Sequence, residues 1–94
     1  MIKIGSLNCR GLRYNLKETQ IATDFKTYKL DILAVQETHI KDTSVKQIKP
    51  LKGSLLNFYN SGNSHRTGVG IITDQNFRGT FTPISDRLCY LEYE

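Results

Sequence analysis

Residues 31–40 of this chain read DILAVQETHI, and this stretch decides the fold. Its apolar run at 32–35 is too short for a helix and is typical of a strand that is buried on both faces. The run ends in four residues with hydrogen-bonding side chains, namely Gln36, Glu37, Thr38 and His39. A buried strand that ends in this way can present polar groups at the edge of a sheet.

The residues before this stretch predict the first half of a βαβ unit. Residues 2–8, IKIGSLN, fit a strand that ends on Asn8. Asn15 and Glu18 have the spacing of a capping box, which predicts the start of a helix of about fifteen residues. The apolar stripe of this helix consists of Ile21, Phe25 and Tyr28.

Two strands joined by a helix lie parallel and usually adjacent, about 4.8 Å apart. We therefore expect Asn8 and Glu37, each of which closes a strand, to face one another at the carboxyl edge of the sheet. A carboxylate and an amide oxygen are ligands that suit Mg²⁺. The spacing alone leaves a second interpretation open, in which Asn8 makes a turn bond and Glu37 is a solvated charge.

The second half of the chain has a different pattern. Val45, Ile48 and Leu51 predict a short helical turn that Pro50 and Gly53 end. The runs that follow predict antiparallel strands at 54–59, 67–73, 79–84 and 88–94. Since the last run reaches Glu94 without a turn, we expect residues 1–94 to end inside a secondary-structure element.

Two glycines, Gly68 and Gly70, lie inside the predicted strand at 67–73. A glycine loop that binds phosphate follows a strand and opens a helix. These glycines instead lie within a β-rich run, so they predict close packing or a bulge.

Length and charge limit the remaining possibilities. The 94 residues are enough for one small domain, with an expected radius of gyration of about 12 Å. The net charge is +4 and the basic residues are scattered, which fits either an ordinary solvated surface or a polyanionic partner. Cys9 and Cys89 lack metal-ligand spacing and are expected to be reduced core residues. No run has the length of a signal peptide or a membrane span, which predicts a soluble protein of the cytoplasm or nucleus.

Three phrases together, SLNCRGL at 6–12, DILAVQETHI at 31–40 and GVGIIT at 68–73, resemble the endonuclease/exonuclease/phosphatase superfamily. Within it, the N-x-x-G-L phrase followed by QETH is most similar to the endonuclease domain of non-LTR (LINE-type) retrotransposons. The resemblance implies a four-layer α/β/β/α sandwich of the DNase I-like type, of which this chain holds the N-terminal portion. It also implies cleavage of DNA with Mg²⁺ or Mn²⁺, and a polyprotein partner that carries reverse transcriptase.

By this resemblance Glu37 is the metal carboxylate, and Asn8 belongs to the same metal site and orients its groups. Many apurinic-site endonucleases have an acidic residue where this chain has Arg10, which could instead contact a phosphate or be a solvated loop charge. A lysine often follows QET in those enzymes, and His39 at that position points to the retroelement branch. We favour no ligand role for His39, and we expect His65 to lie at the surface.

Hydrolysis in this superfamily implies further groups, namely an aspartate-asparagine pair, a tyrosine and a late aspartate-histidine pair. In family order these groups fall after Glu94, so we expect the chain alone to be inactive as a nuclease. Two alternatives remain open. One is a phosphatase or phosphodiesterase that acts on small or lipid phosphoesters, and the other is a non-catalytic remnant or nucleic-acid-binding module.

Overall fold

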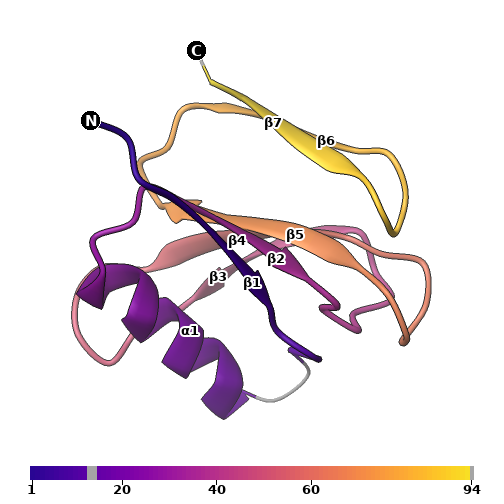
Figure 1. The fold of residues 1–94 in the computed structure, drawn as a ribbon, viewed down its shortest axis with the longest axis horizontal. Helices are drawn as coiled ribbons and strands as arrows, with labels where there is room; N and C mark the ends of the chain where they lie inside the picture. Colours follow the sequence, from indigo (N-terminus) through magenta and orange to yellow (C-terminus); the bar gives the residue numbers. More distant parts are fainter. Residues whose placement is uncertain (13–14, 94) are drawn as a thin grey trace.

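The computed structural model describes residues 1–12 and 15–93, with the backbone alone for Asn15. Its elements in chain order are β1 (Ile4–Asn8), α1 (Asn15–Thr27), β2 (Ile32–Gln36), β3 (Ser44–Ile48), β4 (Leu56–Ser61), β5 (Val69–Asp74), β6 (Gly79–Pro83) and β7 (Cys89–Tyr93). Five strands form one sheet in the order β1-β2-β5-β4-β3, and β6 pairs with β7 in a second sheet. Figure 1 shows α1 on one face of the larger sheet and the two-stranded sheet on the other. The radius of gyration is 12.0 Å, as expected from the length.

The predicted βαβ unit is confirmed. β1 and β2 are adjacent and parallel, in a register that pairs Ile4 with Ile32 and Asn8 with Gln36. Both strands therefore end at the same edge of the sheet. The side chain of Asn15, and with it the predicted capping box, lies outside the described part of the chain. The carboxylate of Glu18 pairs with Lys46 of β3.

The apolar stripe of α1 is shorter than predicted. Ile21 and Phe25 are buried against the sheet, but Tyr28 is 64% exposed. The helix ends at Thr27, and Lys29 has a left-handed φ of 54°. The chain therefore turns away before Tyr28 can join the packed face, so the prediction for Tyr28 was wrong.

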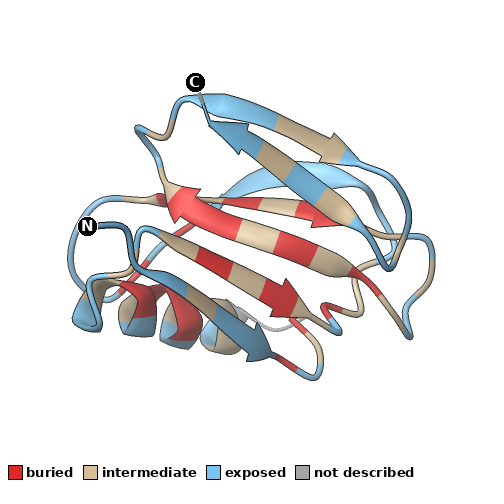
Figure 2. Ribbon diagram, turned by 45° about the horizontal axis from the view of Figure 1, so that its top comes forward, coloured by how far each residue is buried: buried red, intermediate tan, exposed pale blue. Residues whose placement is uncertain are grey.

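The core lies between α1 and the larger sheet. On β2, Leu33 and Val35 face this core and are buried, whereas Ile32 and Ala34 on the other face are only partly covered. Figure 2 shows this alternation of buried and half-buried positions along β2. The prediction of burial on both faces therefore holds fully for one face only. The second sheet covers that other face mainly over β4 and β5, where β6 contacts β4 and β7 contacts β5.

Residues 44–48 form a strand, which corrects the predicted helical turn. β3 pairs antiparallel with β4, with Val45 opposite Tyr59 and Ile48 opposite Leu56. Of the three residues that suggested the turn, Ile48 is buried, while Val45 is 59% and Leu51 is 79% exposed. Their spacing therefore does not define one apolar face, and backbone pairing with β4 decides the conformation.

The four strands predicted after residue 53 are confirmed, with ends that shift by at most two residues. The close packing predicted for the glycines is confirmed as well. A Cβ atom on Gly70 would lie 2.6 Å from the carbonyl oxygen of Tyr59, and one on Gly68 would overlap Thr38 Oγ1. Both positions therefore need a residue without a side chain.

The helix and the two sheets make three layers. The sheets contact one another partly through Tyr59 and Phe81, whose ring centroids are 5.1 Å apart. Among residues 1–12 and 15–93 no helix covers the outer face of β6 and β7, so the four-layer sandwich stays a prediction. In the same described ranges, no helix has the length and apolar character that a bilayer crossing needs.

Candidate metal centre

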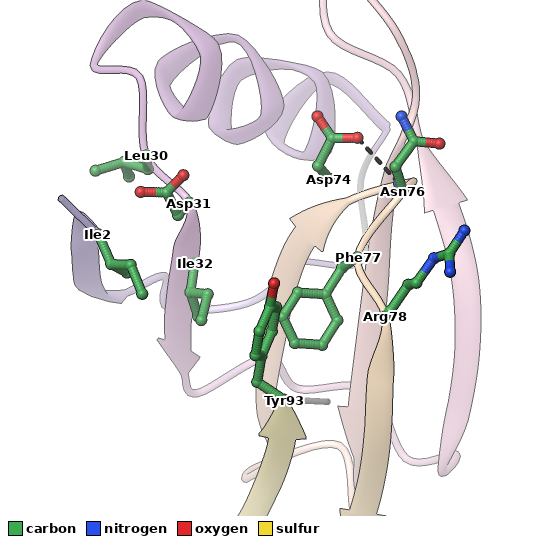
Figure 3. Close-up of a pocket in the computed structure, with 9 residues that line it drawn as sticks. All are labelled: Ile2, Leu30, Asp31, Ile32, Asp74, Asn76, Phe77, Arg78 and Tyr93. Carbon is green, nitrogen blue, oxygen red and sulfur yellow. Dashed lines mark hydrogen bonds between the residues drawn. The ribbon is translucent and has the colours of Figure 1, made fainter.

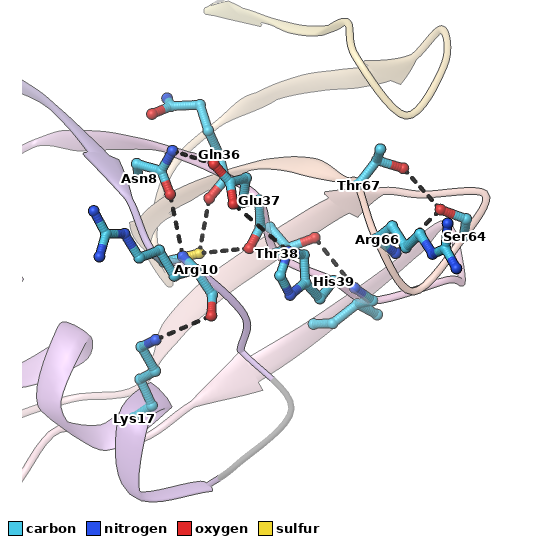
Figure 4. A network of polar contacts seen from close by, with 12 residues as sticks. Asn8, Arg10, Lys17, Gln36, Glu37, Thr38, His39, Ser64, Arg66 and Thr67 are labelled. Atoms are coloured by element: carbon cyan, nitrogen blue, oxygen red, sulfur yellow. Dashed lines mark hydrogen bonds and ion pairs between the residues drawn. The ribbon is translucent and has the colours of Figure 1, made fainter.

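Asn8 and Glu37 are in contact at the carboxyl edge of the sheet, as the βαβ unit predicts. Asn8 is the last residue of β1, and Glu37 directly follows the end of β2. Asn8 Nδ2 donates a hydrogen bond of 2.5 Å to Glu37 Oε2. Figure 4 shows the two side chains pointing toward one another above the strand ends. The predicted proximity is confirmed, while the metal role of both residues stays a prediction.

Asn8 also makes the turn bond that the sequence left open. Its Oδ1 accepts a hydrogen bond of 3.2 Å from the backbone N–H of Arg10, in the manner of an Asx turn. Arg10 has a φ of 51°, and its carbonyl oxygen accepts a bond of 3.4 Å from Lys17 Nζ. The two interpretations of Asn8 are therefore compatible, because its amide oxygen serves the turn and its amide nitrogen serves Glu37.

Arg10 itself lies apart from the carboxylate. Its side chain is exposed, and in Figure 4 it extends away from Glu37. A phosphate contact by Arg10 therefore stays a prediction, and such a phosphate would bind beside the Asn8–Glu37 pair rather than between the two residues.

The loop after β2 brings His39 close to Glu37. The strand ends at Gln36, one residue before Glu37, which the sequence placed at its end, and both Glu37 and His39 have left-handed φ angles, of 55° and 58°. This geometry turns the imidazole back, so that Nε2 of His39 is 3.7 Å from Oε1 of Glu37. Sequence patterns gave no sign of this contact, because left-handed residues other than glycine are uncommon. His65, in contrast, is exposed, as predicted.

Cys9 lies beneath the site. Its thiol is buried and donates to the carbonyl oxygen of Gln36 at 3.0 Å. Burial is the main cause that raises the pKa of the Cys9 thiol, because a thiolate loses hydration there. Cys89 is half-buried, and burial raises its pKa too. Both cysteines are free thiols. Of the two predicted core residues, Cys9 belongs to the core and Cys89 does not.

A shallow groove runs from Glu37 toward the second sheet. It has a volume of about 210 Å³, and its charged lining residues are Glu37, Arg66, Asp86 and Arg87. Asp86 accepts a bond of 2.5 Å from Thr67 Oγ1, which joins the loop before β5 to the loop before β7. The two arginines are exposed. Two arginines therefore line the groove together with Glu37, and the guanidinium group of arginine suits an anionic phosphoester.

The groups at this edge fit a hard divalent cation only in part. The side chain of Glu37 is 48% exposed, so a hydrated ion can reach it. Mg²⁺ keeps several waters and is often held by one or two carboxylates together with substrate phosphates. Across residues 1–12 and 15–93, no group of three or more His, Cys, Asp or Glu residues is arranged to hold a metal ion. Glu37 and Asn8 can therefore supply one side of a metal site.

A larger cavity of about 530 Å³ lies at the opposite end of the sheet and is drawn in Figure 3. Its acidic residues are already engaged in local structure. Asp31 Oδ2 accepts a bond of 2.7 Å from the backbone N–H of Lys3, and Asp74 Oδ1 accepts one of 3.0 Å from that of Asn76. Asp31 thus links the chain before β1 to the chain before β2, and Asp74 stabilises a turn. The groups at the carboxyl edge are therefore the better candidate for chemistry.

Sequence reasoning did not identify two residues that support Glu37. Thr38 and Asn60 are buried, and Thr38 Oγ1 donates a bond of 2.6 Å to Asn60 Oδ1. Thr38 follows Glu37 directly and could have been noticed for that reason. Asn60 is the first residue of the polar, turn-rich stretch NSGNSHR at 60–66, and nothing in its local pattern indicates that it is buried.

A comparison with protein families finds a match over most of the chain. The family model described as Endonuclease/Exonuclease/phosphatase family matches residues 5–89. This range includes both Asn8 and Glu37, together with the loops that line the groove. The comparison with curated proteins finds no match.

Proposed function

Because the chain belongs to the endonuclease/exonuclease/phosphatase family, we propose that it takes part in the metal-dependent hydrolysis of phosphodiester bonds in DNA. The family is generally dependent on divalent metal ions. In this proposal the carboxylate of Glu37 holds Mg²⁺ or Mn²⁺. The observation that carries the proposal is the hydrogen bond of 2.5 Å between Asn8 and Glu37 at the carboxyl edge of two parallel strands.

The two residues have different tasks in this proposal. Asn8 donates its N–H to one carboxylate oxygen of Glu37, which fixes the direction of the other oxygen. Hydrogen bonds of this kind to a ligating carboxylate orient it and tune the metal. When bound, the ion supplies polarisation of a phosphoryl oxygen and stabilisation of the leaving 3′ oxygen. Arg66 and Arg87 bind the phosphates that flank the scissile bond.

The shape of the groove favours DNA over small phosphoesters. Pockets for small molecules usually have volumes of about 300–1,000 Å³ and enclose most of the ligand. The groove beside Glu37 is smaller, about 210 Å³, and both of its arginines are exposed. It suits one phosphate of an extended backbone rather than a whole small ligand. The QETH phrase at 36–39 supports placement in the retroelement branch, with reverse transcriptase in the same polyprotein.

We further propose that these 94 residues bind metal and DNA without cleaving the DNA. Hydrolysis needs a group that activates water in addition to a metal carboxylate. In the part of the chain that the structure describes, Glu37 is joined at this edge by one histidine, His39, and by no acidic cluster. In this proposal the remaining catalytic groups lie outside these residues.

Binding of Mn²⁺ followed by NMR tests the proposal, because paramagnetic broadening detects weak sites. We expect the ion to broaden the signals of Asn8 and Glu37 selectively, and the effect to disappear in Glu37→Gln. Glu92→Gln is the matched control, since Glu92 is an exposed glutamate on β7. Equal broadening in the wild type and in Glu37→Gln would contradict the metal role. Metal-dependent nicking of plasmid DNA that depends on Glu37 would contradict the proposed inactivity.

A further inference from the structure

We propose that Thr38 and Asn60 act as positioning residues, which hold Glu37 in the conformation that meets Asn8. The two residues form a buried hydrogen-bonded pair, called here the Thr38–Asn60 pair. The inference rests on the proposed function, because it assigns the pair a role in the metal affinity of Glu37. Its structural part, the effect on the contact between Asn8 and Glu37, can be measured without any metal.

Both side chains of the pair are buried and hydrogen-bonded. The exposed fraction is 0% for Thr38 and 1% for Asn60. Thr38 Oγ1 donates a bond of 2.6 Å to Asn60 Oδ1. Asn60 Nδ2 in turn donates to the carbonyl oxygens of Ile40 at 3.1 Å and Asp42 at 2.6 Å. One side chain on β4 therefore connects the hydroxyl of Thr38 to the backbone of the loop that leaves β2.

The backbone on either side of Thr38 is strained. Glu37 and His39 both have left-handed φ angles, and such residues persist only where the surrounding structure fixes them. The Thr38 N–H donates to the carbonyl oxygen of Gly68 at 3.1 Å, and the His39 N–H donates to that of Thr67 at 2.8 Å. The loop is thus attached to the chain before β5, and the side chain of Thr38 makes the attachment to Asn60 of β4 that lies nearest to Glu37.

Glu37 is attached from the opposite side as well. Its carbonyl oxygen accepts a bond of 2.7 Å from the N–H of Gly11, in the loop that follows Asn8. The carbonyl oxygen of Thr38 accepts one of 2.8 Å from Leu12. The peptide units next to Glu37 therefore connect the loop after β1 to the loop after β2. Rotation of Thr38 would move both loops relative to each other and separate Asn8 from Glu37.

Gly68 leaves Thr38 little freedom to rotate. A Cβ atom on Gly68 would overlap Thr38 Oγ1, so the hydroxyl is packed directly against the glycine backbone. Loss of the hydroxyl leaves Asn60 Oδ1 buried without this donor, which is costly for a buried acceptor. Without this bond the loop after β2 can relax, and Glu37 can leave its left-handed conformation.

Thr38→Val is the main test, because valine keeps the shape of threonine and removes the hydroxyl. We expect the NOE between the Asn8 side-chain amide and the Glu37 side chain to weaken. We also expect Mn²⁺ affinity to fall about 10-fold or more, the usual effect of losing a group that supports a metal ligand. Thr38→Ser should restore both readouts. Thr73→Val is the matched control, since Thr73 is also buried at 0% exposure but lies toward the other end of the sheet.

A second comparison covers the case in which valine prevents folding. Thr38→Ser and Thr38→Ala differ only in the hydroxyl, so their difference in NOE and Mn²⁺ affinity reports the same bond. If Ala and Ser give equal values, or if Thr38→Val matches Thr73→Val in both readouts, the positioning role is wrong. A chain that folds with Ser but not with Ala would also overturn it, because the hydroxyl would then serve the whole fold.

The outcomes separate the two proposals. If the wild type does not bind Mn²⁺ at Glu37, the metal function fails, and the NOE still decides whether the pair positions Glu37. If the wild type binds Mn²⁺ and the affinity is unchanged in Thr38→Val, the metal function stands and the positioning role fails.

Discussion

Three glycines of this chain allow the cost of backbone strain and the cost of steric overlap to be measured separately. Gly53 and Gly68 both have φ angles that favour glycine, of 104° and 116°. A Cβ atom on Gly53 would meet Lys26 Cε at an ordinary 3.5 Å, whereas one on Gly68 would overlap Thr38 Oγ1. Gly70 lacks a left-handed φ, but a Cβ atom there would lie 2.6 Å from the carbonyl oxygen of Tyr59.

Alanine at each position should therefore give a different loss of stability. Gly53→Ala carries only backbone strain of about 1–3 kcal/mol, reduced by about 0.4–1 kcal/mol because alanine restricts the unfolded chain. The net loss is about 1 kcal/mol. Gly68→Ala adds the disturbance of the buried Thr38–Asn60 bond, about 1–3 kcal/mol, for a total of about 3 kcal/mol. Gly70→Ala carries overpacking alone, about 1–3 kcal/mol.

Urea unfolding followed by circular dichroism is a suitable assay, because the chain has no tryptophan. The midpoint should fall in each variant while the denaturant slope stays constant. In thermal unfolding, each kcal/mol corresponds to about 4–8 °C for a domain of this size, so Gly68→Ala should melt about 12–24 °C below the wild type. If Gly68→Ala and Gly53→Ala are equally stable, the close approach of Gly68 to Thr38 is not present, and the reasoning about the loop fails.

Three further predictions concern the site and the thiols. Asn8→Ala should weaken Mn²⁺ binding about five-fold, the effect of losing a charge-assisted hydrogen bond at a half-exposed carboxylate. Ser6→Ala is the control in a Mn²⁺ titration, since Ser6 bonds to Gln36 and not to Glu37. Equal Mn²⁺ affinities of the two variants would contradict the prediction. Arg66→Ala should lower the slope of log K against log salt for duplex DNA by about 0.9, whereas Lys52→Ala, at an exposed position outside the groove, should leave it unchanged. Burial raises the pKa of Cys9 and Cys89, so the folded state keeps these protons above the ordinary cysteine pKa of about 8.5. The stabilisation is therefore complete below that pH and is lost as the pH rises through the raised pKa values. Urea unfolding at neutral and alkaline pH should show this loss, and the loss should be smaller in Cys9→Ala.

The first half of the fold could be predicted because its signals are local. An apolar run at 32–35, a preceding strand pattern and an amphipathic segment between them give a βαβ unit. The chirality and connection rules of such units then place the two strand ends together. For this reason the contact between Asn8 and Glu37 followed from the sequence, although they are 29 residues apart.

Two corrected predictions show where local patterns fail. Residues 44–48 contain a spacing that suits a helical turn, but they form β3 because β4 offers them a row of backbone partners. Tyr28 fits the stripe of α1 in the sequence, but the helix ends one residue earlier. In both cases a neighbour that is distant in the sequence, or a turn that the pattern does not encode, decided the outcome.

The sequence by itself determined which residues could carry chemistry and at which edge of the sheet they lie, because both depend on short contiguous runs. Only the tertiary structure decided how Glu37 is held. Its left-handed φ, the return of His39 to within 3.7 Å, and the bond between Thr38 and Asn60 across 22 residues all depend on contacts between separate loops. Such contacts arise when the strands pair and bury their polar side chains together, and no local pattern specifies them.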